Sequence, residues 1–410
     1  MVGLATPGPL CRELAQALPE RPFAIEFWDG TRLEPTSDSG PTFRVRGPGA
    51  VTHLLRAPGQ LGIGRAYVSG LLEVDDLDAA MALLEGWSAP ALDARARLRL
   101  ALAALPASGL RLPPAVPEIE LRPRGRRHSR ERDRRAVRHH YDVSNEFFAL
   151  FLDESMTYSC AVFSRGAQTL EQAQEAKLEL VASKLGLRAG ERVLDVGCGW
   201  GSFAIHAAAR HGVRVLGITL SEPQARLARE RVADAGLGEQ VEIRVADYRE
   251  LSGDRFDAIA SIGMVEHVGS VQIDEYAARL GELLVPGGRL LNHGIARLRV
   301  GDPEAGPFSE RYVFPDAAPL HLSRVLTAIE RAGLITQHVE GLPGDYIKTL
   351  EHWAERLDGR LDDAVRLAGA ERVRVWRLYL RAARNGFRVG FTGIYQVLAH
   401  RPQAGAPAPF

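Results

Sequence analysis

A glycine-rich segment, Val193–Gly201, is the stretch of the chain whose residue types point most directly to ligand binding. An apolar run ends in three glycines at alternate positions, Gly197, Gly199 and Gly201, with Trp200 between the last two. Glycines at such a turn let the backbone approach a ligand closely. The spacing differs from the G-x-G-x-x-G pattern of dinucleotide sites. Asp195, just before the first glycine, is suited to a cationic ligand group, or alternatively to capping the helix that follows.

Polar side chains also follow the next two apolar runs of the sequence. In the segment Thr219–Gln224, Ser221 is placed to cap a helix and Gln224 to contact polar groups of a ligand. Asp247 and Tyr248 follow the third run. A carboxylate there can accept from an exocyclic amine, and an aromatic ring can cover an adenine. The alternative is that Asp247 only caps a loop. Three such positions together are more specific than any one alone.

Apolar runs of strand length alternate with helical sequence over the second half of the chain. The expected strands are Arg192–Val196, Val213–Thr219, Val241–Ala246, Phe256–Ile262 and Arg289–His293. The expected helices between them include Gly201–Ala209, Pro223–Ala235 and Ile273–Leu284. This alternation predicts an α/β fold with a mostly parallel sheet covered by helices on both faces. The ligand should lie at the carboxyl ends of the strands, where the segments described above fall.

The other parts of the chain carry weaker patterns. Residues 1–115 predict a small α+β domain, with strands or a helix at Ala24–Trp28, Thr42–Val45 and Ala50–Leu55, and helices at Val74–Trp87 and Leu92–Leu105. Near the other end, Ile394–Ala399 predicts a late strand at an edge of the sheet. We expect residues 1–115 to be an accessory domain that associates with lipid, residues 116–138 to be a linker, and residues 139–410 to be the catalytic domain. A helical lid insertion is expected at about 297–385.

Composition limits the possible functions. The 410 residues are 46% hydrophobic and 25% charged, which is ordinary for a globular protein. Lys plus Arg and Asp plus Glu both number 51, so no overall charge favours nucleic acid as a partner. The three cysteines are far apart, which fits a reducing cytoplasm better than a disulfide framework and offers no metal-binding spacing. No run of 18 apolar residues and no signal-peptide pattern is found, so we expect a cytoplasmic protein that does not cross a membrane.

Two features next to each other suggest contact with a membrane surface. Nine arginines lie between Arg122 and Arg138. They are either a solvated hinge or a site for anionic lipid head groups, and each basic residue near such a surface contributes about 1 kcal/mol. The aromatic stretch Phe147–Phe151 follows; it is either a core face or a wall that faces acyl chains or the membrane. We therefore expect peripheral association with the inner face of the membrane.

Several motifs together resemble the family of cyclopropane-fatty-acyl-phospholipid synthases and mycolic acid methyltransferases, which are class I enzymes that use S-adenosylmethionine (AdoMet). The resemblance covers about two-thirds of the chain, from residue 136 to residue 400. The matching stretches are His140-Tyr-Asp-Val-Ser-Asn145, Met156-Thr-Tyr-Ser-Cys160, Leu194–Gly201, Gly263-Met-Val-Glu-His-Val-Gly269, Arg311-Tyr-Val-Phe-Pro315, Asp345-Tyr346 and Gly386-Phe-Arg388. Residues 1–115 resemble the extra domain of the longer members, which act on phospholipids.

The resemblance implies two ligands and the residues that bind them. AdoMet contacts would fall on Tyr158, Ser159, Asp195, Gly197, Gly199, Trp200, Gly201, Thr219, Ser221, Gln224, Asp247 and Tyr248. The family holds a bicarbonate ion beside the methyl group, and its cradle would be Cys160, Glu266, His293, Ile295 and Tyr346. Glu266 would accept from the bicarbonate hydroxyl, while His293 and Tyr346 donate to the ion or orient it.

Departures from the family pattern concern the product. Many relatives have a cysteine four residues before the Phe of the last motif, where this chain has Ala383. Methyl transfer to an alkene produces a carbocation. Loss of a proton from the new methyl group gives a cyclopropane, whereas a hydride shift followed by proton loss gives a methylene branch. Ala383 and the altered sequence around Phe387 and His293 favour the methylene-branched (10-methylene) chain, and the cyclopropane is the alternative.

Other functions and partners remain open at this point. A small-molecule AdoMet methyltransferase would use Glu266 and His293 as ordinary acid–base groups, and an AdoMet-binding protein without enzyme activity is a further alternative. A nucleic-acid methyltransferase is disfavoured by the balanced charge. The expected partners are an unsaturated phospholipid acyl chain and an anionic membrane surface. A separate reductase and a homo-oligomer are also open.

Overall fold

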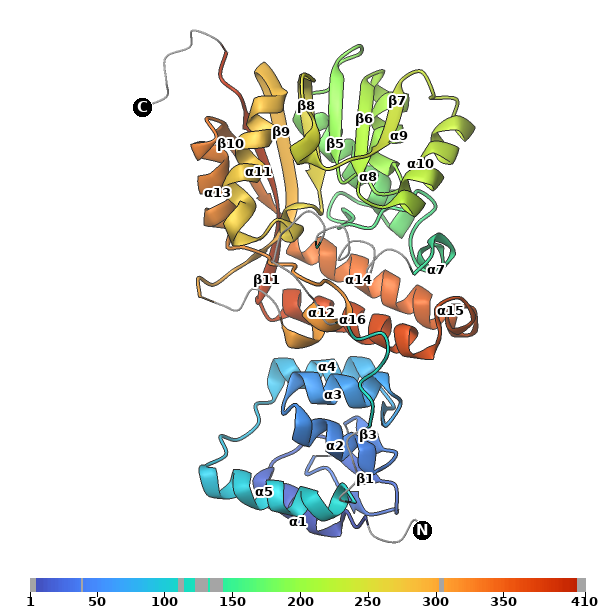
Figure 1. Cartoon of the computed structure of the whole chain (residues 1–410), viewed down its shortest axis with the longest axis vertical. Coiled ribbons are helices and arrows are strands. Elements are labelled where there is room, and N and C mark those ends of the chain that lie inside the picture. The colour runs from blue at the N-terminus through green and yellow to red at the C-terminus, as the bar shows by residue number, and fades with distance from the viewer. Residues whose placement is uncertain are drawn as a thin grey trace. The chain divides into compact units, whose positions relative to one another are not determined.

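The computed structural model describes residues 5–37, 40–109, 114–121, 132, 143–301 and 306–403. The chain divides into two compact units (Figure 1). The first comprises Met1–Arg122, Gly306–Val313 and Gly369–Asn385, and the second comprises Pro123–Ala305, Phe314–Ala368 and Gly386–Phe410. Two short stretches from the second half of the chain thus belong to the N-terminal unit.

The first unit is a small α+β fold, as the sequence predicts. Its four-stranded sheet has the order β2 (Arg32–Leu33), β1 (Ala24–Phe27), β3 (Thr42–Val45), β4 (Leu72–Val74). Its helices are α1 (Gly8–Ala17), α2 (Pro48–Arg56), α3 (Gln60–Val68), α4 (Leu77–Gly86), α5 (Ala94–Ala107), α12 (Pro307–Tyr312) and most of α16 (Ala370–Arg388). The helix predicted from Val74 begins only at Leu77, because Asp76 caps it by accepting from the backbone of Asp78 and Ala79.

The second unit contains a seven-stranded sheet with helices on both faces (Figure 1), so the predicted fold class is confirmed. The strand order is β10 (Ile335–Gly341), β11 (Thr392–His400), β9 (Leu284–Arg297), β8 (Phe256–Ile262), β5 (Arg192–Val196), β6 (Arg214–Thr219), β7 (Val241–Val245). The five strands from β9 to β7 are parallel, and β11 is antiparallel to both of its neighbours.

Alternate side chains of the central strands point to two separate cores, as the period of a strand requires. Val193 of β5 and Val215 of β6 pack against α8 (Leu170–Leu185), α9 (Ser202–His211) and α10 (Glu222–Asp234). Their neighbours Leu194 and Leu216 pack on the other face against α11 (Gly269–Leu283) and α13 (Leu322–Arg331). Further helices of this unit are α7 (Asn145–Ala149), α14 (Pro343–Asp358), α15 (Leu361–Ala368) and the short 3₁₀ turns η1 (Tyr248–Glu250) and η2 (Val265–His267).

Two predictions about this sheet are wrong in part. Ile394–Ala399 lies in a strand, but that strand is internal, because β10 pairs with its outer side. Strand β10 is not predicted from the sequence, because it is an edge strand with a polar, largely exposed sequence, Ile-Thr-Gln-His-Val-Glu-Gly, rather than an apolar run. The fifth predicted strand begins at Leu284 instead of Arg289.

The aromatic stretch Phe147–Phe151 belongs to the core. Phe147, Phe148 and Phe151 are fully buried, and Phe148 packs 5.1 Å from Trp200 between ring centroids. The alternative of a membrane-facing surface is therefore wrong for these three rings. No helix among the described residues is long and apolar enough to cross a bilayer.

Candidate active site

Residues 197–201, called the glycine loop below, lie at the carboxyl end of β5 and form the floor of the candidate active site. Gly197, Gly199 and Gly201 have φ angles of +79°, +54° and +81°, a region that other residues adopt only with strain. Backbone N–H groups of Gly197 and Cys198 both donate to the carbonyl of Ile218, which ties the loop to β6. Helix α9 begins directly after Gly201. The loop thus presents its backbone between two neighbouring pockets, both lined by Gly197, Gly199 and Gln224.

The first pocket lies at the carboxyl ends of β5, β6 and β7 and encloses about 930 Å³ of empty space, its open mouth included. Of the predicted AdoMet residues, it brings together Gly197, Gly199, Thr219, Gln224, Asp247 and Tyr248. It is also lined by residues that the sequence analysis did not assign to the ligand, among them Met264, His267, Gln272, Pro315 and Asp316. The mixed polarity of the lining suits a nucleoside.

Asp247 lines the first pocket and also caps a loop. It is buried and lines the pocket, and it also caps η1 by accepting from the backbone N–H of Arg249 at 2.9 Å. The Arg249 guanidinium donates to both carboxylate oxygens, at 2.9 and 2.6 Å. A ligand that hydrogen-bonds to Asp247 must therefore share this carboxylate with Arg249. The neighbouring Tyr248 packs edge-on against Tyr276.

The turn after β6 is fixed by its own side chains. The hydroxyl of Thr219 donates to the amide oxygen of Gln224 at 2.9 Å, and both residues line the first pocket. Ser221 is fully buried, caps α10 by accepting from the backbone N–H of Gln224, and lines neither pocket. Gly201 also lines neither; a Cβ there would lie 3.3 Å from that of Ala228, so this glycine lets α9 and α10 pack closely.

The second pocket lies on the other side of the glycine loop. It brings together Tyr158, Ser159, Asp195 and Trp200 of the predicted AdoMet residues. The Trp200 indole donates to Asn145 at 2.7 Å, and Tyr158 stacks on Trp353 with 5.1 Å between ring centroids. These contacts hold two aromatic walls in fixed positions.

Lys177 is the residue of this pocket that the sequence analysis missed. It lies on α8 and is fully buried, and its ammonium donates to the hydroxyl of Ser159 at 2.8 Å. Burial lowers the pKa of Lys177 to about 8, although Asp153, Cys160 and Asp195 favour its charged form. One feature of the sequence could have indicated this residue. Lys177 is one of only three lysines in the chain, and arginine supplies almost all the other positive charge.

Asp195 faces the same pocket with a spare acceptor. It is 2% exposed, and its Oδ2 has no hydrogen-bond partner among the described residues. Burial raises the pKa of Asp195 to about 7, opposed by the charge of Lys177 and by a hydrogen bond from the Ala204 backbone. That last bond is the capping role, and it leaves Oδ2 without a partner in the described structure. A buried acceptor without a partner indicates space for a donor on a ligand.

The five predicted bicarbonate residues line neither pocket and fall into two groups. In the first, Oε1 of Glu266 accepts from the backbone N–H of Ile295 at 2.7 Å, while Oε2 is buried without a partner in the described structure. Burial raises the pKa of Glu266 to about 7, and the Ile295 N–H opposes this. His293 lies two residues before Ile295 on β9, so the two point to the same side of the sheet. Gly294 between them leaves room for η2, since a Cβ there would lie 2.2 Å from Cγ1 of Val265.

His293 is buried and held neutral. Burial, with the charges of Lys177 and Lys184, lowers its pKa to about 3. The amide nitrogen of Gln396 lies 3.2 Å from Nδ1 of His293, and the amide oxygen of Gln396 accepts from Lys184 at 2.7 Å. Because an ammonium can only donate, the Gln396 amide must turn its nitrogen towards His293. Nδ1 is then an acceptor, and the ring proton lies on Nε2, which has no partner among the described residues.

The second group contains Cys160 and Tyr346. Cys160 is fully buried, and burial raises the pKa of its thiol well above the usual value, so it is not a thiolate. Asp345 accepts from the backbone of Phe163 and Ser164 at 2.6 and 2.7 Å, which ties the segment after Cys160 to the start of α14, where Tyr346 lies. The backbone N–H of Leu342 donates to the carbonyl of Ile394 of β11. Ile394 in turn is paired with Ile295 of β9 in the sheet.

Most of the Arg-rich segment 122–138 lies outside the described residues. Of its nine arginines only Arg132 is described, and its guanidinium forms a two-point ion pair with the buried Asp316, which lines the first pocket. Arg132 is therefore part of the fold and is not free to contact lipid.

Comparison with known proteins gives consistent matches. Residues 128–397 match the family model described as mycolic acid cyclopropane synthetase. The chain is 39% identical over 391 residues to a probable fatty acid methyltransferase of Pseudomonas putida, covering 93% of each chain. It is 34% identical over 400 residues to a tuberculostearic acid methyltransferase of Mycobacterium tuberculosis, covering 94% of this chain and 89% of that protein.

A solved structure matches about two-thirds of the chain. It is a mycolic acid cyclopropane synthase complexed with SAH and CTAB, with a TM-score of 0.62 and 32% sequence identity. The match covers 65% of this chain and 98% of that one. The two methyltransferases named above match a larger share of this chain, 93% and 94%.

Proposed function

Because this chain belongs to the mycolic acid cyclopropane synthetase family, we propose that it transfers the methyl carbon of AdoMet to the double bond of an unsaturated fatty acyl chain of a phospholipid, giving a methylene-branched (10-methylene) chain. The observation that carries the proposal is a pair of buried polar atoms without partners among the described residues, Oε2 of Glu266 and Nε2 of His293. They lie on neighbouring elements, η2 and β9. Gly263, which lines both pockets together with the glycine loop, donates its backbone N–H to the carbonyl of His293.

The residues around the glycine loop fit AdoMet by their chemistry. Oδ2 of Asp195 would accept from the ammonium group of the methionine part of AdoMet. The buried ammonium of Lys177 would be the counter-charge for the carboxylate of that methionine part. Thr219, Gln224, Asp247 and Tyr248 would hold the adenosine in the first pocket. AdoMet supplies an electrophilic methyl group. The matched cyclopropane synthase is complexed with SAH, which is AdoMet without that methyl group, and this supports the assignment.

Glu266 and His293 fit a small oxyanion such as bicarbonate. His293 is neutral with its proton on Nε2, so it offers a donor, and the free Oε2 of Glu266 offers an acceptor for a hydroxyl. An ion held this way would supply a base that takes the proton released after methyl transfer, and its charge would stabilise a nearby cation. Cys160 and Tyr346 would complete the cradle. The raised pKa of Glu266 implies that the acceptor form is gained as the pH rises through about 7.

The choice of product rests on similarity and on one residue. Two full-length relatives are named methyltransferases, one of them for tuberculostearic acid. Ala383 replaces the cysteine that many family members have. The cyclopropane product is the second candidate, because the matched solved structure is of a cyclopropane synthase. A methylene branch would become a methyl branch only through a separate reductase.

The test is incubation of the purified full-length protein with AdoMet and vesicles of a dioleoyl phospholipid. Both products add one CH₂ unit, so mass spectrometry establishes the transfer but not the product. Proton NMR of the extracted lipid separates them: an exocyclic methylene is vinylic, and cyclopropane protons resonate upfield of the bulk chain. We expect vinylic protons. A clean cyclopropane signal would overturn the product, and no gain of mass would overturn the whole proposal.

A further inference from the structure

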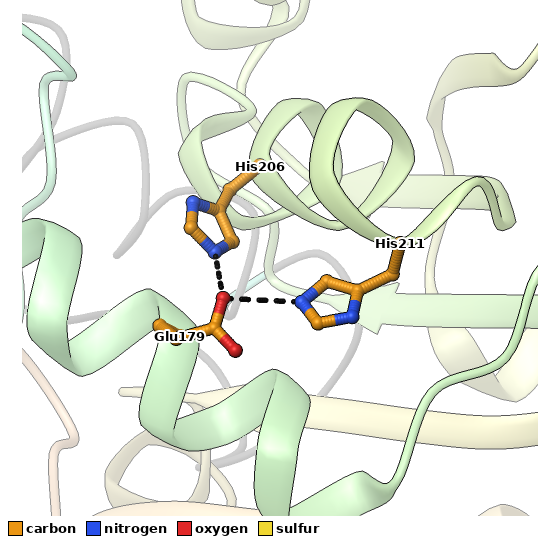
Figure 2. Close-up of side chains that lie close together, drawn as sticks. All are labelled: Glu179, His206 and His211. Atoms are coloured by element: carbon orange, nitrogen blue, oxygen red, sulfur yellow. Dashed lines mark hydrogen bonds and ion pairs between the residues drawn. The ribbon is translucent and has the colours of Figure 1, made fainter.

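A cluster of two histidines and one glutamate lies on α8 and α9, outside the residues that line the two active-site pockets (Figure 2). Glu179 extends from α8 towards His206 and His211 of α9. Nε2 of His206 lies 3.2 Å from Oε2 of Glu179, and Nε2 of His211 lies 3.1 Å from the same oxygen. All three side-chain atoms lie within 4.8 Å of one another.

These distances are those of ligands around a metal ion as well as those of hydrogen bonds. With metal–ligand bonds of about 2.0–2.1 Å, neighbouring ligand atoms of a tetrahedral zinc site lie roughly 3.3 Å apart. Two imidazole nitrogens and one carboxylate oxygen are also a common set of zinc ligands, with a fourth position left for water. Binding of an ion would replace the two N–H···O bonds, and the three ligand atoms already lie within 4.8 Å of one another.

A neighbouring hydroxyl group orients Glu179 for binding a metal ion. The hydroxyl of Ser183 donates to Oε1 of Glu179 at 2.8 Å, which turns Oε2 towards the two histidines. Such a bond from outside the ligand set is typical of metal sites, because it fixes the orientation of a ligand. Arg210 and Glu175 form an ion pair at 2.9 Å, but their side chains are 64% and 59% exposed, so solvent screens both charges and they act weakly on the cluster.

The cluster is also accessible from solvent. An open surface pocket lined by Gln172, Glu175, Ala176, Glu179, His206 and Arg210 gives an ion access from solvent.

We propose that Glu179, His206 and His211 bind a divalent transition-metal ion, Zn²⁺ fitting the ligand set best, and that this ion ties α8 to α9. The two helices both border the glycine loop: α9 begins directly after it, and α8 carries Lys177, nearly opposite Glu179 around the helix. The ion would restrain these helices from the outer side of the sheet and takes no part in methyl transfer.

The test is calorimetric titration of Zn²⁺ into the full-length protein, without an affinity tag and after treatment with a chelator. We expect one ion per chain in the wild type, and loss of that binding in Glu179→Gln and in His206→Gln. Glu175→Gln is the matched control: it removes a carboxylate one turn away on the same helix that is not a ligand, and should bind like the wild type. Ser183→Ala should weaken binding by about 10-fold, the lower end for outer-shell partners of a metal.

Two further measurements distinguish loss of metal binding from loss of the folded structure. Zn²⁺ should raise the melting temperature of the wild type and of Glu175→Gln but not of Glu179→Gln, because only a protein that binds the ion in its native state is stabilised by it. Co²⁺ in place of Zn²⁺ should give the intense visible absorption of a four-coordinate site. Absence of Zn²⁺ binding in the wild type, or equal affinity in the Glu179→Gln and His206→Gln variants, would overturn the proposal. Neither outcome depends on methyltransferase activity.

Discussion

The amide nitrogen of Gln396 lies 3.2 Å from Nδ1 of His293, although the two residues are 103 positions apart in the chain. Lys184 fixes the orientation of that amide through its oxygen, and Glu340 in turn pairs with Lys184. This series of contacts assigns the proton of the buried imidazole to Nε2. The donor that His293 offers to the site is therefore set by residues that do not reach the site themselves.

Gln396→Glu should reverse this assignment. A carboxylate next to Nδ1 can only accept, so the imidazole proton would move to Nδ1 and Nε2 would lose its donor. We expect turnover to fall by about 10- to 100-fold, the range seen for outer partners of functional histidines. AdoMet affinity, measured by calorimetry, should change little. Turnover equal to the wild type would show that the tautomer of His293 is unimportant.

Glu266→Gln should reduce turnover on the order of 100-fold or more, as expected for a lost acid–base or electrostatic group. AdoMet affinity should stay within a few-fold of the wild type. Since burial raises the pKa of Glu266 to about 7, the ionised acceptor is gained with rising pH, and kcat of the wild type should increase from pH 6 to pH 8.

This increase in kcat should be absent in Glu266→Gln, and bicarbonate should stimulate the depleted wild type but not the variant. Asp195 also has a pKa raised to about 7, but it faces the cofactor pocket, so its titration should appear in AdoMet affinity instead of kcat. A pH profile of kcat that is the same in both proteins would contradict the role of Glu266.

Lys177→Met should weaken AdoMet binding, because it removes the buried ammonium beside Ser159 and leaves a side chain of similar length. We expect a loss of about 10-fold or more, the size of one charge-assisted hydrogen bond. The matched control is Lys348→Met, an exposed lysine on α14, which should bind normally. In the wild type, affinity should fall as the pH rises through about 8 and Lys177 loses its charge. Equal affinities in the two variants would exclude this role.

Gly294→Ala should destabilise the second unit. The new Cβ would lie 2.2 Å from Cγ1 of Val265, and overpacking of this kind costs about 1–3 kcal/mol. Gly344→Ala, in a position with no atom within 4 Å of the added Cβ, is the control and should have a small effect. Thermal unfolding measures both. Adding Val265→Ala to Gly294→Ala should restore part of the lost stability; if it does not, the steric explanation is wrong.

Replacing Arg124, Arg126, Arg127 and Arg130 by Ser should reduce binding to anionic vesicles. The choice omits Arg132, whose ion pair with Asp316 belongs to the fold. Binding of the wild type should also weaken at high salt, because charges at a surface are screened over about 8–10 Å near physiological ionic strength. Vesicle co-sedimentation measures both effects. Equal binding to neutral and anionic vesicles would contradict the proposed peripheral association.

The sequence by itself determined the parallel strands of the second unit and its glycine loop. Buried parallel strands are continuous apolar runs, so Arg192–Val196 and Phe256–Ile262 were predicted with the bounds that the structure has. The three glycines of the loop all have positive φ, which is a local requirement and is therefore visible in the sequence. The motifs also indicated the family, which the comparisons confirm.

Only the tertiary structure decided which residues from distant segments meet. The polar edge strand β10, the burial of Lys177, the contact of Gln396 with His293 and the cluster around Glu179 have no local pattern. Each depends on how separate helices and strands pack, and packing joins residues whose spacing in the chain carries no period. The same holds for Phe147, Phe148 and Phe151: their apolar spacing fits a core or a membrane surface equally well, and the neighbouring aromatic rings place them in the core.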